Sequence, residues 1–170
     1  MTILPYKRVT IDVPKPPAEV AADLRAFVEP RKWFRFSWNH KPFEGNVFPT
    51  GFRIWRIIHY RNSFRPVLHG HFEETSDGTR VHVTMKLHPL VFGFLCYWFG
   101  FLALFSLAGG LASIQNAGAN SFLLGFGFCA GMGLFGFGLT YFGFWFEVPK
   151  SRKLLEQALG GRALSVPARE

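Results

Sequence analysis

The sequence predicts a mixed α+β protein: a two-helix transmembrane hairpin, a small N-terminal cytoplasmic antiparallel sheet with one helix, and a short C-terminal helix. Residues 87–146 contain no Asp, Glu, Lys or Arg, residues 1–86 show strand patterns, and all basic residues flank the uncharged stretch. The 170 residues suit about one domain. Their uneven polarity excludes a soluble enzyme, a secreted disulfide scaffold and a plain nucleic-acid-binding module.

The uncharged stretch is long enough for two membrane-spanning helices. One span needs roughly 20 residues, and the stretch has one polar break, at 113–121. The break separates spans of about 89–112 and 122–146. Pro89 suits a first helical turn, where no backbone N–H is needed, and Glu147 ends the second span. A buried helical hairpin of a soluble protein is the alternative interpretation.

The basic residues predict the orientation of the hairpin. Residues 1–86 carry 14 of the 19 Lys and Arg, residues 147–170 carry the other five, and the polar break carries none. Positive charge stays on the cytoplasmic side, so both termini are expected there. The chain then divides into a cytoplasmic α+β domain (1–86), a hairpin (87–146) and a cytoplasmic C-terminal helix and tail (147–170). We expect a multi-pass protein of the bacterial inner (plasma) membrane.

The N-terminal domain shows both strand and helix patterns. Residues 7–13 alternate and are rich in Val, Ile and Thr, which favours a strand. Residues 18–28 place apolar side chains on one helical face. Residues 51–61 are predicted to form another strand, and residues 67–74 and 79–86 form the clearest hairpin of strands.

Asp77-Gly78 is the preferred two-residue hairpin turn. Closing the turn there pairs Phe72 with Val83 and His71 with Thr84. The buried face is then expected to carry Leu68, Phe72, Val81, Val83 and Met85, and the wet face His69, His71, Glu73, Arg80, His82 and Lys86.

Candidate chemistry on the wet face is sparse. His69, His71 and His82 with Glu73 share that face, so a zinc or copper site is geometrically possible. A solvated polar face with incidental histidines is the favoured interpretation, and we expect no metal, no cofactor and no catalytic set. Glu147 is expected to pair with Lys150 or with a basic residue of the sheet domain.

A cluster of arginines suggests contact with the membrane surface. The net charge is +8, and anionic headgroups attract nearby Lys and Arg by about 1 kcal/mol each. Nucleic acid is the alternative partner, but lipid explains the same charge without a further partner. The expected headgroup contacts are Arg53, Arg56, Arg61 and Arg65.

Glycines form two grooves on the second span. At about 100° per residue, Gly125, Gly133, Gly136 and Gly143 fall on one side, and Gly127, Gly131 and Gly138 on the other. Small residues permit close helix packing in membranes. One groove is expected to take the first span, through a stripe containing Gly93, Gly100 and Gly110. The other groove is left for a second neighbour, unless glycine is simply frequent in membrane helices.

Several segments resemble a family of uncharacterised bacterial membrane proteins with two spans, common in cyanobacteria. They are residues 4–6, 29–37, 56–64 and 87–89, in letters LPY, EPRKWFRFS, RIIHYRNSF and LHP. The resemblance covers most of the chain and implies a two-span membrane protein, but no activity. The opening VTIDVP at 9–14, followed by a helix, is also similar to START-like helix-grip domains, whose curved sheet can enclose lipids.

These patterns predict a non-enzymatic membrane scaffold or interaction subunit, either homo-oligomeric or part of a larger membrane complex. Its partners are membrane lipids and membrane subunits, not nucleic acid. A homo-oligomeric channel is a second interpretation, although the absence of charge in the spans disfavours ion selectivity. A membrane-tethered lipid-binding domain is the third.

Overall fold

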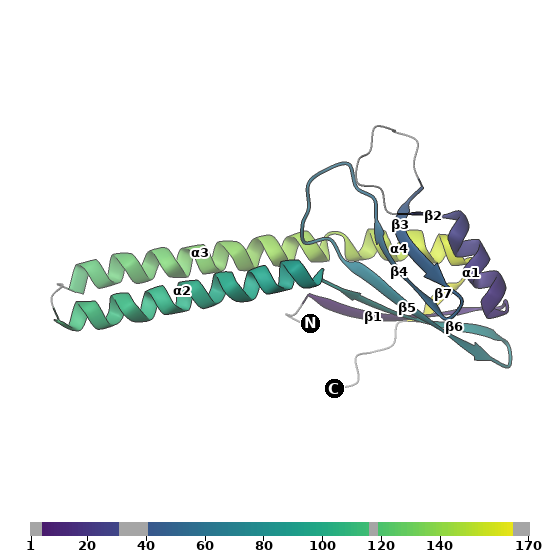
Figure 1. Ribbon diagram of the computed structural model, residues 1–170, viewed down its shortest axis with the longest axis horizontal. Coiled ribbons are helices and arrows are strands. Elements are labelled where there is room, and N and C mark those ends of the chain that lie inside the picture. Colours follow the sequence, from purple (N-terminus) through teal and green to yellow (C-terminus); the bar gives the residue numbers. More distant parts are fainter. Residues whose placement is uncertain (1–4, 31–40, 116–118, 165–170) are drawn as a thin grey trace.

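The computed structural model describes residues 5–30, 41–115 and 119–164. Within these ranges, a long pair of helices projects from a body of sheet and helices (Figure 1). The body contains β1 (Tyr6–Val13), α1 (Pro17–Ala26), β2 (Val28–Glu29), β3 (Phe43–Phe48), β4 (Gly51–Arg56), β5 (Val67–Thr75), β6 (Gly78–Lys86), α4 (Val148–Leu159) and β7 (Arg162–Leu164). The projecting pair is α2 (Pro89–Gln115) and α3 (Ala119–Trp145).

The predicted mixed α+β class is confirmed, with two helices long and apolar enough to cross a membrane. The strands of the described residues form one sheet in the order β2-β3-β4-β5-β6-β1-β7. Its neighbours are antiparallel except β2 and β3. The family-like letters at 31–37, the centre of the polar break at 116–118 and the tail at 165–170 lie outside the described residues.

The register of the β5–β6 hairpin differs from the prediction by two positions. Phe72 pairs with Val81, and Thr75 pairs with Gly78, so Ser76 and Asp77 form the turn. Gly78 opens β6 at φ +141°, where an added Cβ would lie 2.3 Å from the Val13 carbonyl oxygen. Glycine is therefore needed inside the strand rather than in the turn.

The predicted faces of this hairpin are confirmed, because a shift by an even number of positions keeps the alternation. Leu68, Phe72, Val81, Val83 and Met85 are all buried. His71, Glu73, Arg80, His82 and Lys86 are exposed on the other face, where His69 is half-buried.

Other strand predictions need correction. The strand expected over 51–61 ends at Arg56, and residues 57–66 form a loop that packs against α3. The helix expected over 18–28 ends at Ala26, and Val28 belongs to β2. β3 was not predicted, because Gly45 interrupts its pattern. Gly45 has φ +142° and leaves 2.3 Å between an added Cβ and the Arg53 carbonyl oxygen.

One apolar core unites the N-terminal and C-terminal parts of the body. Leu24 of α1 and Leu155 and Leu159 of α4 are buried in the same cluster as the strand residues Ile11 and Ile54. The amphipathic helix α4 thus completes a core that residues 6–86 begin. The segments before and after the helix pair therefore fold as one unit, although 61 residues separate β6 from α4.

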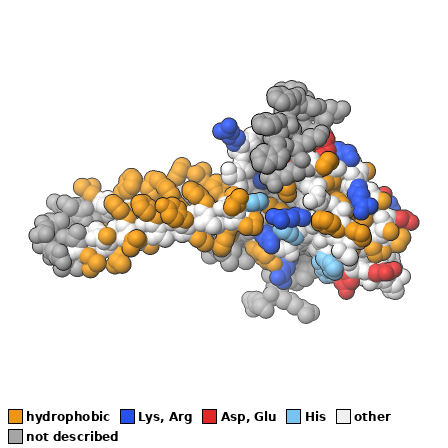
Figure 2. All heavy atoms as spheres, in the orientation of Figure 1, with side chains coloured by type: hydrophobic (Ala, Val, Ile, Leu, Met, Phe, Trp, Pro, Cys, Tyr) orange, Lys and Arg blue, Asp and Glu red, His pale blue; other side chains and the backbone are white. Residues whose placement is uncertain are grey.

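The helix pair exposes most of its apolar surface. Each helix has 27 residues, or about 40 Å at 1.5 Å per residue. The apolar windows lie within Pro89–Leu111 and Leu123–Leu159, and only 11% of each is buried. Apolar side chains cover the visible face of the pair, whereas charged side chains gather on the body (Figure 2).

Candidate functional site at the junction of helices and sheet

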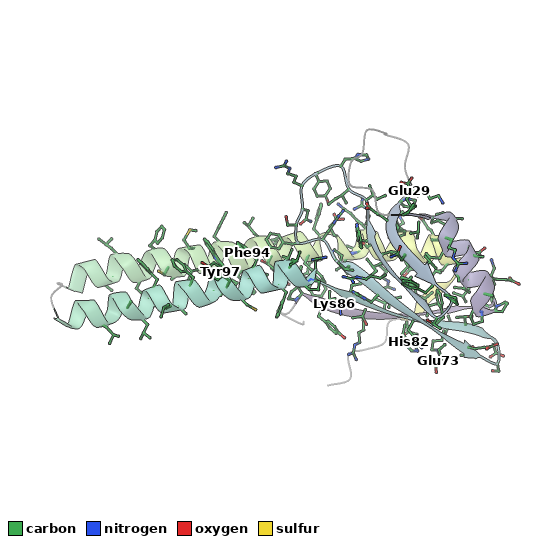
Figure 3. All side chains as sticks on the ribbon, in the orientation of Figure 1. Glu29, Glu73, His82, Lys86, Phe94 and Tyr97 are labelled. Carbon is green, nitrogen blue, oxygen red and sulfur yellow. The ribbon has the colours of Figure 1, made fainter. Side chains whose placement is uncertain are left out.

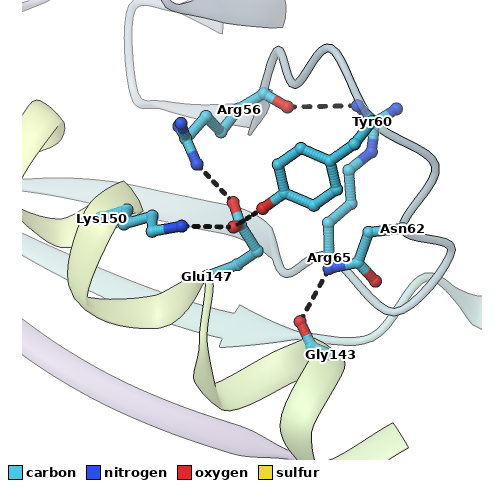
Figure 4. Close-up of polar contacts among 7 residues, drawn as sticks. All are labelled: Arg56, Tyr60, Asn62, Arg65, Gly143, Glu147 and Lys150. Carbon is cyan, nitrogen blue, oxygen red and sulfur yellow. Dashed lines mark hydrogen bonds and ion pairs between the residues drawn. The ribbon is translucent and has the colours of Figure 1, made fainter. Parts of the chain in front are cut away.

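The helical hydrogen-bond pattern tightens by one residue where α3 meets α4. The Glu147 N–H donates to the Phe144 carbonyl at 3.1 Å instead of the Gly143 carbonyl one residue earlier. This tighter turn frees the Gly143 carbonyl, which accepts a 2.8 Å hydrogen bond from Asn62 Nδ2 (Figure 4). The loop 57–66 is therefore attached to the last turn of α3 by a side-chain amide.

Glu147 is a fully buried carboxylate at this junction of α3 and α4. Arg56 Nη1 donates to its Oε2 at 2.6 Å, the Tyr60 hydroxyl donates to its Oε1, and Lys150 Nζ lies 3.5 Å from Oε1 (Figure 4). A buried charge is tolerated only when it is paired and hydrogen-bonded. These partners hold α3, α4, β4 and the loop together at one point.

The carboxylate also affects the tyrosine that donates to it. Desolvation, followed by the hydrogen bond to Glu147, raises the pKa of the Tyr60 hydroxyl. The hydroxyl therefore keeps its proton at neutral pH and acts as a donor. The ring itself remains 45% exposed, so Tyr60 joins the buried cluster to the surface of the loop.

The predicted pairing of Glu147 with Lys150 or a basic residue of the sheet domain is confirmed, since both kinds of partner are present. Arg56 was expected to contact lipid headgroups. The structure instead commits its guanidinium to Glu147 and leaves 23% of its side chain exposed. Of the other expected headgroup residues, Arg53 is exposed on β4, and Arg61 and Arg65 lie on the loop.

The structure selects which glycine groove faces the interior. An added Cβ at Gly136 would lie 3.3 Å from Trp98 Nε1, and one at Gly133 would lie 4.0 Å from Leu102. Gly143 faces the loop, with Phe64 at 3.1 Å. The inner groove of α3 therefore receives large side chains of α2 and of the loop.

The remaining glycine positions are open. No heavy atom lies within 4 Å of an added Cβ at Gly93, Gly100, Gly125, Gly127, Gly131 or Gly138 in the described chain. We predicted that the stripe containing Gly93 and Gly100 packs against the second span of the same chain. The structure shows no such contact at these two positions, so this prediction is wrong for packing within one chain. Gly110 is half-buried. The bulky residues Trp98 and Leu102 provide the contact instead, because they reach across the space that the α3 glycines leave.

The histidines of the outer sheet face do not converge. His71 lies opposite His82, and His82 Nε2 lies 2.7 Å from Glu73 Oε2 (Figure 3). Across the described residues, no group of three or more His, Cys, Asp or Glu side chains is placed to hold a metal ion. The hydrogen bond from His82 lowers the pKa of Glu73. Burial, with Lys86 and Arg53 nearby, lowers the pKa of His69.

Comparison with known proteins adds no relative. No family model matches the chain, and no curated protein or solved structure matches it. The two resemblances stated from the sequence therefore remain predictions, and the function must be argued from this junction and the helix pair.

Proposed function

We propose that the protein is an integral inner-membrane scaffold or interaction subunit without enzymatic activity. In this proposal α2 and α3 cross the bilayer as a hairpin, and the body and both termini lie in the cytoplasm. The observation that carries it is the exposure of the two apolar helices, only 11% of whose span windows is buried. Water hydrates such a surface poorly, and a bilayer covers it.

Rigid attachment of the body supports a scaffolding role. Only Leu87 and His88 separate β6 from α2, and Glu147 fixes the end of α3 to Arg56 and Tyr60. The body is then held against the membrane surface in one orientation. A surface presented in a fixed orientation is suited to binding other membrane subunits.

The open groove of α3 supports association within the membrane. Gly127 and Gly131 line the side of α3 away from α2, and no heavy atom of the described chain lies within 4 Å of a Cβ added at either position. Helices pack closely in membranes through small residues. A second copy, or a helix of a larger complex, would gain dispersion contacts there that lipid tails match less well.

Cysteine labelling tests the topology. In a variant that lacks Cys96 and Cys129, Asn120→Cys should react with an impermeant thiol reagent added outside intact bacterial cells. Ser76→Cys, in the β5–β6 turn, should react only after the membrane is opened. Ser76→Cys labelled from outside, with Asn120→Cys protected, would contradict the orientation. Equal labelling of both from outside would contradict the crossing itself.

A further inference from the structure

The loop 57–66 separates two hollows at the base of the helix pair. One is a pocket of about 760 Å³ whose lining combines charged and polar residues, including Glu44, Arg61, Arg65 and His88, with apolar residues such as Trp55 and Val67. The other is a mainly apolar groove of about 620 Å³ along the end of α3. Residues 60–63 line both hollows. A single bound molecule that touches this loop would therefore meet charged groups on one side and a mainly apolar surface on the other.

The first hollow, the pocket, carries an excess of positive charge. Arg61 is exposed there and makes no hydrogen bond or ion pair with any described residue. Arg65 is oriented by a 3.1 Å hydrogen bond from its Nη1 to the Arg56 carbonyl (Figure 4). Glu44, the acidic residue in the lining, is buried and engaged in an interaction of its own. Two guanidinium groups against one carboxylate favour an anion, and guanidinium matches phosphate geometry.

The apolar groove lies on the membrane-facing side of the loop. Leu139, Phe142 and Phe146 line it, and each of these side chains is 48% or more exposed. Gly138 leaves the groove open, because its missing side chain would meet nothing within 4 Å. Trp145 also lines the groove, and its indole Nε1 is buried without an acceptor in the described chain.

The position of both hollows matches the membrane surface. Val91, in the first turn of α2, lines the pocket, and the groove follows the last two turns of α3. In the proposed topology these turns lie at the level of lipid headgroups. The pocket then lies at the depth of the lipid headgroups, and the groove, on the other side of the loop, lies at the depth of the acyl chains.

We propose that this junction binds one anionic phospholipid, with its phosphate in the pocket at Arg61 and an acyl chain in the groove of Leu139 and Phe142. The proposal rests on the membrane-spanning function proposed above. Of the four arginines that the sequence predicted to contact lipid headgroups, the proposal assigns the phosphate contact to Arg61 and places Arg65 beside it in the same pocket. Glycerol phosphate shares the phosphate chemistry without the chain, so it distinguishes a lipid site from a site for free phosphate compounds.

The test measures lipid retained by the full-length protein in mild detergent, by native mass spectrometry. Phosphatidylglycerol, zwitterionic phosphatidylcholine and soluble glycerol phosphate are added separately. We expect phosphatidylglycerol to be retained about tenfold more than phosphatidylcholine, because both lipids offer a phosphate to Arg61 but the choline cation of phosphatidylcholine is repelled by the positive charge of the pocket. Arg61→Gln should remove about this tenfold preference.

Two further variants complete the test. Arg53→Gln, on β4 outside both hollows, is the matched charge control and should retain lipid as the wild type does. Gly138→Leu places a side chain in the groove, so it should lower phosphatidylglycerol retention and leave glycerol phosphate unaffected. Wild-type retention by Arg61→Gln, equal retention of the two lipids, or glycerol phosphate binding as tightly as the lipid would overturn the proposal.

The cysteine labelling described above separates this proposal from the one on which it rests. Labelling that shows crossing helices, combined with no preference for phosphatidylglycerol, overturns the lipid site alone. Labelling that shows no crossing overturns the membrane topology first, and the lipid site with it.

Discussion

The body and the helix pair use the same apolar residue types in opposite ways. Leu155 in α4 is fully buried, whereas Leu134 in α3 is 73% exposed. In the body, apolar side chains alternate with polar ones and turn inward, so the protein supplies its own apolar surroundings. In the helix pair, most large apolar side chains point outward, which suits the pair to apolar surroundings such as the bilayer proposed above. Exposure within the chain therefore describes the contacts of a side chain in the body, but in the proposed topology it does not describe the lipid contacts of α2 and α3.

The largest loss of stability is expected from a substitution at the junction of the body and the helix pair. Arg56→Ala removes the closest charged partner of the buried Glu147, and breaking a buried ion pair costs about 3–5 kcal/mol. We expect a loss of this size in the free energy of unfolding, measured by denaturation in detergent and followed by near-ultraviolet circular dichroism.

Two controls sharpen this first prediction. Arg53→Ala, on the same strand but exposed, should change stability by no more than about 0.5 kcal/mol. Adding Glu147→Gln to Arg56→Ala should recover part of the loss, because no unpaired charge is then buried. If Arg56→Ala is as stable as Arg53→Ala, the ion pair of Arg56 with Glu147 contributes little to the stability of the protein.

The same leucine-to-alanine substitution should lower the free energy of unfolding in the body but not in the helix pair. Leu155→Ala should cost about 2–5 kcal/mol, because it leaves a cavity in the body. Leu134→Ala should change the same free energy by no more than about 0.5 kcal/mol, because the unfolded helix keeps this position in lipid. The measurement is chemical unfolding of both variants in nanodiscs. Equal losses would mean that Leu134 is buried against another protein surface.

The smallest changes in stability are expected from substitutions in the two glycine grooves of α3. Gly136→Leu overpacks the contact with Trp98, which costs about 1–3 kcal/mol. Gly131→Leu meets open space and should leave the fold intact but reduce the size of the assembly in mild detergent, measured by native mass spectrometry. If the wild type is a monomer in nanodiscs and Gly131→Leu changes nothing, association through this groove is wrong.

Much of the fold was predictable from local patterns. The uncharged stretch predicts two long apolar helices, and alternation predicts the faces of the β5–β6 hairpin, even though the register shifted by two. The register was missed because the Asp77-Gly78 pattern favours a turn, whereas contact with the Val13 carbonyl requires glycine at the start of β6. β3 was missed because Gly45 interrupts its pattern, and β7 was missed because a short edge strand depends on tertiary contacts more than on pattern.

The candidate site was only partly predictable. The charge of Glu147 beside a long apolar helix already indicates a need for a partner, and the pairing was found. The choice of Arg56 and Tyr60 as partners depends on how the loop 57–66 folds back onto Gly143, a contact across 81 residues of sequence. No local pattern encodes such a contact, so the two hollows beside the loop could not be predicted either.

The order of elements has a consequence for biosynthesis. The helix pair is inserted in the chain between β6 and α4, so the ribosome delivers Leu155 and Leu159, which complete the core of the body, only after both helices have been made. In the proposed topology, the second helix must return to the cytoplasm before α4 can dock. In that topology the body would be completed only after both helices had inserted, and a chain stalled halfway across would leave the core of the body exposed to cellular proteases.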